Sequence, residues 1–161
     1  MNRESVARMD TAASPRSLEK ERRIVQAQHA VLRDLLGRTR RTASEVLAAR
    51  EPIAALVDQI STLRDFLDVH LRDEESFLIP VLQGAGDWGQ LRLSCLQAEH
   101  AHQRAVMAVL SGDAARRAPK ELARRTLLLA ADLLSDLEQE ERELLSPTLP
   151  SDVQNAKQNI A

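Results

Sequence analysis

Residues 66–80, FLDVHLRDEESFLIP, carry the clearest sign of how the chain folds. Four of its residues follow one another at intervals of four: Phe66, His70, Glu74 and Leu78. On an α-helix, residues with this spacing stack on one face. Two ionisable side chains therefore stand in a stripe that is otherwise apolar and faces a core. Burying such groups is costly unless they pair or bind a metal ion. The stretch predicts a long helix with His70 and Glu74 turned inward.

Helical periodicity extends outward from this stretch into four segments. They are separated by Glu51-Pro52, by the Gly-Ala-Gly run at 84–86, and by residues 111–119, which contain Gly112 and Pro119. The predicted helices run from about 18 to 50, 52 to 82, 88 to 110 and 120 to 145. Short corners between long amphipathic helices favour antiparallel neighbours. We therefore predict an all-α fold, an antiparallel up-down-up-down four-helix bundle with a metal site in its core.

The bundle is predicted to be the only domain, at residues 17–149. The segments on either side, 1–16 and 150–161, have no apolar period and are predicted to be flexible tails. The net charge of -2 gives no footprint for nucleic acid or an anionic membrane. No apolar run is long enough to be a signal peptide or a membrane span. One cysteine, Cys95, cannot form an internal disulfide, so we predict a reducing cytoplasmic location.

The other three predicted helices also carry ionisable side chains on an otherwise apolar face. His29 lies on the apolar stripe of the first helix, and His100 lies on that of the third. Asp136 and Glu140 interrupt the stripe of the fourth helix, four residues apart like His70 and Glu74. A lone histidine on such a stripe is more often a hydrogen-bonded core residue than a ligand. Several converging groups instead indicate a common partner.

Spacing from the corners predicts that these groups converge. His29 and His70 lie almost equally far from the first corner, His70 and His100 from the second, and His100 and Asp136 from the third. Because every helix rises by about 1.5 Å per residue, equal spacing places all four at one height. The two glutamates lie one turn further, toward the same end of the bundle. The predicted metal ligands are His29, His70, Glu74, His100, Asp136 and Glu140.

An internal repeat supports the same arrangement. QAQHAVLR at 26–33 matches QAEHAHQR at 97–104, which aligns the two single histidines. HLRDEESFLI at 70–79 matches DLEQEERELL at 136–145, which aligns the two inward glutamates. The second half of the chain therefore repeats the first, as expected for a bundle with an approximate two-fold axis through a two-metal centre.

On these residues, the chain resembles the hemerythrin-like (HHE cation-binding) domain family between the two tails. The stretch at 66–80 is similar to that family's H-x-x-x-E-E segment, and the segments around His29 and Glu99-His100 resemble its first and third helices. The resemblance implies two non-haem iron ions, joined by carboxylates and an oxo or hydroxo bridge. It also implies a role in binding or sensing dioxygen, in sensing iron, or in defence against nitric oxide or peroxide.

The sequence departs from the family at two positions. Asp136 stands where the family brings a histidine, and Arg104 stands where oxygen carriers bring another. Asp136 is either a ligand or the partner of Arg104 or Arg33. Two further acids, Glu75 and Glu141, lie beside the stripes and are predicted to be solvated or to support the ligands rather than bind metal.

The donor set favours iron, with manganese or zinc less suited, because structural zinc prefers closed sites rich in cysteine and histidine. The leading hypothesis is a di-iron protein that binds, senses or reacts with a small ligand: dioxygen, peroxide or nitric oxide. The alternative is a metal-free or degenerate bundle that acts as a protein-interaction module. The sequence identifies no catalytic residue, leaves enzymatic turnover open, and does not name a protein partner.

Overall fold

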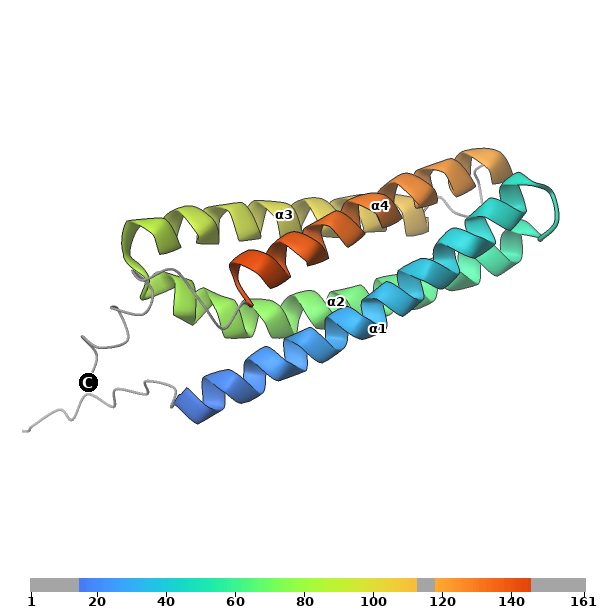
Figure 1. Ribbon diagram of the computed structural model, residues 1–161. Coiled ribbons are helices and arrows are strands. Elements are labelled where there is room, and N and C mark those ends of the chain that lie inside the picture. Colours follow the sequence, from blue (N-terminus) through green and yellow to red (C-terminus); the bar gives the residue numbers. More distant parts are fainter. Residues whose placement is uncertain (1–14, 113–117, 146–161) are drawn as a thin grey trace, which may run out of the picture.

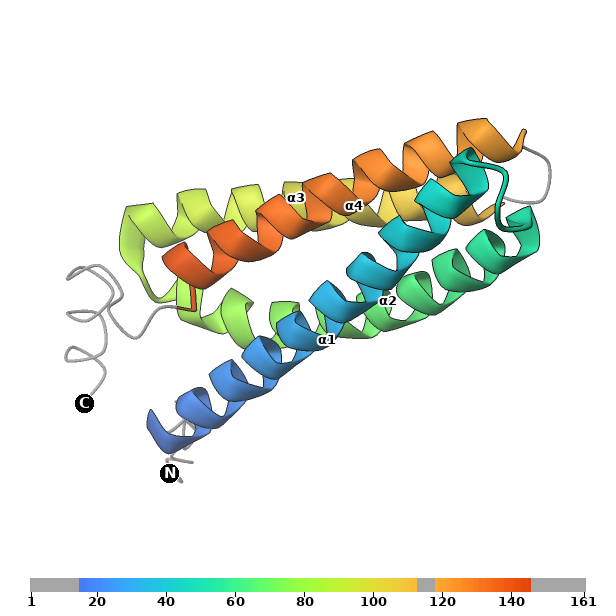
Figure 2. The ribbon, with the colours of Figure 1, turned by 45° about the vertical axis from the view of Figure 1, so that its right-hand side comes forward.

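The computed structural model describes residues 15–112 and 118–145, and these residues form four α-helices. The helices are α1 (Pro15–Leu47), α2 (Ile53–Gln83), α3 (Gly86–Gly112) and α4 (Pro119–Glu143). They run up and down along one long direction in Figure 1, and the turned view in Figure 2 shows the same arrangement. The predicted all-α, four-helix architecture is confirmed. Apart from residues 15 and 16, which begin α1, the predicted tails lie outside the described residues.

The corners explain where the helices end. α1 ends at Leu47, three residues before the predicted end, because Ala49 takes a left-handed conformation with φ 56°. The amide of Arg50 then donates to the carbonyl of Glu45 at 2.9 Å, which closes the helix end. At the next corner Gly86 has φ 62°, a conformation that glycine adopts without steric cost. α4 begins with Pro119, which suits a first helical turn.

The core is divided into two apolar clusters. α1 packs on α2 and α4, and α2 packs on α3. The large cluster lies toward the α1–α2 corner and includes Leu36, Leu63 and Leu133. The small cluster lies toward the α2–α3 corner and consists of Val25, Leu78, Leu82, Leu93, Leu96, Leu144 and Leu145. Each fully buried leucine contributes roughly 1.5–3 kcal/mol to folding, so the clusters fix the positions of the helices on either side of the polar groups between them.

The polar groups predicted from the sequence lie between the two clusters. On α2, for example, Glu74 stands between Leu71 of the large cluster and Leu78 of the small one. On α4, Glu140 stands between Leu137 and Leu144 in the same way. The site therefore has an apolar wall at each end. None of the helices in the described ranges is long and apolar enough to cross a membrane.

Candidate metal centre

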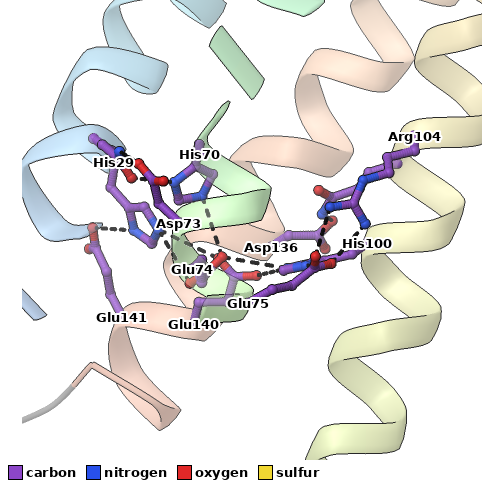
Figure 3. A network of polar contacts seen from close by, with 12 residues as sticks. His29, His70, Asp73, Glu74, Glu75, His100, Arg104, Asp136, Glu140 and Glu141 are labelled. Atoms are coloured by element: carbon purple, nitrogen blue, oxygen red, sulfur yellow. Dashed lines mark hydrogen bonds and ion pairs between the residues drawn. The ribbon is translucent and has the colours of Figure 1, made fainter. Parts of the chain in front are cut away.

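Five of the six predicted ligands are buried together at one height of the bundle. The exposed fractions of His29, Glu74 and His100 are 0%, and those of His70 and Glu140 are 1% and 3%. Figure 3 shows these side chains reaching toward one another from all four helices. Spacing from the corners predicted the three histidines at one height and the two glutamates one turn further along, and these five side chains do meet in one short stretch of the interior.

The centre of the group is formed by imidazole Nε2 atoms and carboxylate oxygens. Nε2 of His70 and Nε2 of His100 each lie 3.4 Å from Oε2 of Glu74. Nε2 of His29 lies 3.8 Å from Oε1 of Glu74 and 3.6 Å from Oε2 of Glu140. Ligand atoms of His29, His70, Glu74 and Glu140 all lie within 4.8 Å of one another, so this group of four can hold a metal ion.

Several of these atoms have no hydrogen-bond partner among the described residues. They are Nε2 of His29, Nε2 of His100 and both carboxylate oxygens of Glu74. Buried polar atoms in folded proteins are nearly always hydrogen-bonded. An unpartnered set of nitrogen lone pairs and carboxylate oxygens that point at one spot instead fits a cation. The residues present thus fit a metal ion, because their inward atoms are suitable metal donors and are not hydrogen-bonded to one another.

The outer nitrogens of the histidines are all occupied. Nδ1 of His29 lies 3.1 Å from Oε1 of Glu141, and Nδ1 of His100 lies 2.9 Å from Oε1 of Glu75. Nδ1 of His70 lies 3.1 Å from Oε1 of Gln28. Every imidazole in the group is therefore fixed from outside and directs Nε2 to the interior.

Two arginines complete this outer layer. Arg33 donates to both oxygens of Glu141 at 2.7 and 2.8 Å, and Arg104 donates to both oxygens of Glu75 at 2.7 and 2.9 Å. The suggested pairing of Asp136 with either arginine is thus wrong, since both arginines bind other carboxylates. Glu75 and Glu141 were predicted to be either solvated or in support of the ligands, and the structure favours support; the role of the arginines in holding them was not predicted. The signal was present, because an arginine follows each of the two aligned histidines by four residues.

Asp136 is placed differently from the other five. Its side chain is half-buried, and its Oδ2 accepts a hydrogen bond from Nε2 of Gln103 at 3.0 Å. Like His100, it does not belong to the group of four that can share one ion, but unlike His100 it makes none of the close contacts with Glu74. It lies beside Glu140 in the wall of a small cavity of about 10 Å³. Asp136 therefore borders the centre, and its role as a ligand stays a prediction.

Burial and neighbouring carboxylates shift the pKa values of the buried histidines in opposite directions. Burial lowers the pKa of His29 and lowers that of His70 to about 4, so both rings are neutral at pH 7. Burial acts the same way on His100, but the carboxylates of Glu140, Glu74 and Glu75 outweigh it and raise its pKa to about 10. Burial also raises the pKa of Glu140. Without a metal ion, the site is thus partly neutralised by a proton on His100.

The chain was compared with protein families, curated proteins and solved structures. The model of the hemerythrin HHE cation-binding domain matches residues 21–147, a range that contains all four helices except the first residues of α1. No curated protein and no solved structure matched the chain.

Proposed function

Because the chain belongs to the hemerythrin HHE cation-binding domain family, we propose that its buried cluster binds two iron ions. The observation that supports two ions is the orientation of the two glutamates. Glu74 presents Oε1 to His29 and Oε2 to both His70 and His100, and Glu140 presents Oε2 to His29 and Oε1 to His100. Each carboxylate thus spans from His29 to His100, which is the arrangement expected of a bridging ligand.

The proposed ligands divide between two positions. One ion would be held by His29 and His70, the other by His100 with Asp136 as a further donor, and Glu74 and Glu140 would bridge them. Mixed imidazole and carboxylate donors suit iron, or else manganese, better than a structural zinc site. Bound iron would supply electron transfer and an open coordination position for an external ligand.

The surroundings of the site favour a small external ligand. The cavity beside Glu140 is lined by five leucines, with Gln103 and Asp136 as its other polar residues. A volume of about 10 Å³ admits at most about one water-sized molecule, so only a ligand of very few atoms is compatible with it. We therefore propose that the protein binds, senses or reacts with dioxygen, peroxide or nitric oxide. We also propose a cytoplasmic location, on the basis of the single cysteine.

Anaerobic purification followed by elemental analysis tests the metal proposal. We expect about two irons per chain after reconstitution with ferrous iron. Less than one iron or manganese per chain, unimproved by reconstitution, would refute it. The reduced protein is then exposed separately to dioxygen, peroxide and nitric oxide while its visible spectrum is recorded. A Glu74→Gln variant controls for iron bound elsewhere, because Glu74 lies at the middle of the cluster.

The alternative function is that of a metal-free bundle that acts as an interaction module. It is favoured by Asp136, which stands in place of the family's histidine and is hydrogen-bonded to Gln103. Metal that binds only the native state adds to the free energy of unfolding, by about 2.7 kcal/mol at a hundred times the dissociation constant. We expect the melting temperature to fall when a chelator removes the metal. An unchanged melting temperature, with the metal confirmed absent, would favour the interaction module.

A further inference from the structure

The outer contacts of His29 and His100 form the same three-residue chain twice. In the first chain, Arg33 binds both oxygens of Glu141, and Glu141 contacts Nδ1 of His29. In the second, Arg104 binds both oxygens of Glu75, whose Oε1 contacts Nδ1 of His100. We call these two chains the imidazole clamps; both run from the buried centre to half-buried arginines, and Figure 3 shows the second with all three residues labelled.

The two clamps arise from the internal repeat. The repeat aligns His29 with His100 and Arg33 with Arg104, and the residue after each inward glutamate is the clamping one. The clamps join different helices, however, since the first ties α1 to α4 and the second ties α3 to α2. The same contacts therefore recur in two independent places, which argues against an accidental surface ion pair.

The chemistry of a clamp determines which ring nitrogen carries the proton. A carboxylate held by both arms of an arginine is ionised and can only accept hydrogen bonds. The proton of a neutral imidazole facing it must then lie on Nδ1, which leaves a lone pair on Nε2. The opposite choice needs only a small movement, because Nε2 of His29 lies 3.6 Å from Glu140 and 3.8 Å from Glu74, just beyond hydrogen-bonding distance. Carboxylates thus face the ring at both of its nitrogens.

We propose that Glu75 and Glu141, each held by its arginine, are positioning residues that keep the proton of the neutral His100 and His29 rings on Nδ1, so that Nε2 of each ring is turned inward to bind metal. Without the clamp on His29, the proton moves to Nε2, where Glu140 and Glu74 accept it, and the metal-binding lone pair is lost. The effect on metal affinity rests on the proposed function, but the position of the proton does not.

The first test is the tautomer of His29 in the metal-free protein. Nitrogen NMR of the imidazole distinguishes a proton on Nδ1 from one on Nε2, and a spectrum of His29→Gln assigns the signals. At about pH 8, above the ordinary imidazole pKa, we expect the proton on Nδ1 in the wild-type chain. We expect it on Nε2 in Glu141→Ala and on Nδ1 again in Glu141→Gln, whose amide oxygen still accepts. A wild-type ring protonated on Nε2 overturns the proposal without any variant.

The second test is zinc affinity, measured by competition with a coloured chelator, because zinc is redox-inert. Loss of an outer partner typically weakens metal binding by 10–100-fold. We expect a loss of that size in Glu75→Ala and Glu141→Ala, and a smaller one in the glutamine variants. The exposed acids Asp58 on α2 and Asp132 on α4 give matched controls, Asp58→Asn and Asp132→Asn, in which affinity should not change.

The two tests separate the proposals. Equal zinc affinity in the wild type and both alanine variants overturns the positioning role. If the wild-type chain binds no zinc, manganese or iron, the metal function is refuted, and the tautomer experiment alone then decides whether the clamps act as described. Thermal melts of every variant show whether a loss of affinity comes from unfolding.

Discussion

The two unpartnered oxygens of Glu74 predict that Glu74→Gln will stabilise the metal-free protein and destabilise the metal-loaded one. In the metal-free protein this carboxylate is fully buried, and neither oxygen has a hydrogen-bond partner among the described residues. Leaving a buried polar group unsatisfied costs roughly 1–3 kcal/mol. Glu74→Gln keeps the size of the side chain, removes the charge, and adds an amide that can donate to the free Nε2 of His29. His100 keeps Glu75 as its carboxylate partner, at 2.9 Å.

We therefore expect Glu74→Gln to stabilise the metal-free protein by about 1–3 kcal/mol. For a chain of this length, each kcal/mol shifts the melting temperature by about 2–4 °C, so the expected rise is about 2–12 °C. With metal present the order should reverse, because the wild type gains binding free energy that the variant has lost. A residue that is costly in the empty fold and stabilising in the loaded one is typical of a functional site.

The assay is thermal unfolding followed by helical circular dichroism, in chelator and, under anaerobic conditions, in excess ferrous iron. The matched control is Glu21→Gln, the same change at an exposed position of α1, which should alter neither melt. A Glu74→Gln variant that melts below the wild type in chelator would contradict the reasoning, because it would mean that Glu74 already has adequate partners without metal.

Three further predictions concern protons, stoichiometry and redox behaviour. Near pH 7 His100, with a pKa of about 10, holds a proton and Glu140, with a pKa of about 7, is partly protonated, and a metal ion must displace these protons. Apparent affinity should therefore rise with pH, and calorimetry in buffers of different ionisation enthalpy should show proton release; pH-independent binding would contradict this. Asp136→Ala should retain at least one tightly bound metal, since the group of four does not include Asp136; elemental analysis showing less than one metal per chain would count against it. The extra negative charge of Asp136 should favour ferric over ferrous iron, so the reduced protein should oxidise in air to a stable diferric state. Spectra that bleach fully through repeated cycles of air and argon would rule that out.

The sequence alone predicted the level at which the donors meet. Helix rise is constant and the corners are short, so equal spacing of His29, His70 and His100 from the corners translates directly into height. The stripe on α2 likewise predicted correctly that His70 and Glu74 face inward. These successes depend on backbone geometry, which periodicity and corner positions report well.

The outer partners and the position of Asp136 depend instead on side-chain geometry. Residues beside a stripe, such as Glu75 and Glu141, can turn either to solvent or to a neighbouring helix, and spacing does not distinguish the two. Asp136 occupies the register of His70, but an aspartate is shorter than a histidine and Gln103 binds its carboxylate. The sequence repeat therefore predicts where the backbone of Asp136 lies, but it does not predict which groups its shorter side chain contacts.

The first imidazole clamp also bears on how the bundle opens. The contact between His29 and Glu141 joins residues 112 positions apart, and a metal ion held by His29 and the adjacent Glu140 would act as a reversible cross-link across almost the whole fold. Closing a loop of that length in the unfolded chain is worth on the order of 4–5 kcal/mol, judged from disulfides. Amide hydrogen exchange should then be slowest around the centre and fastest at the helix ends. Loading the metal should slow exchange in α1 and α4 together, so that the first and last helices behave as one cooperative unit.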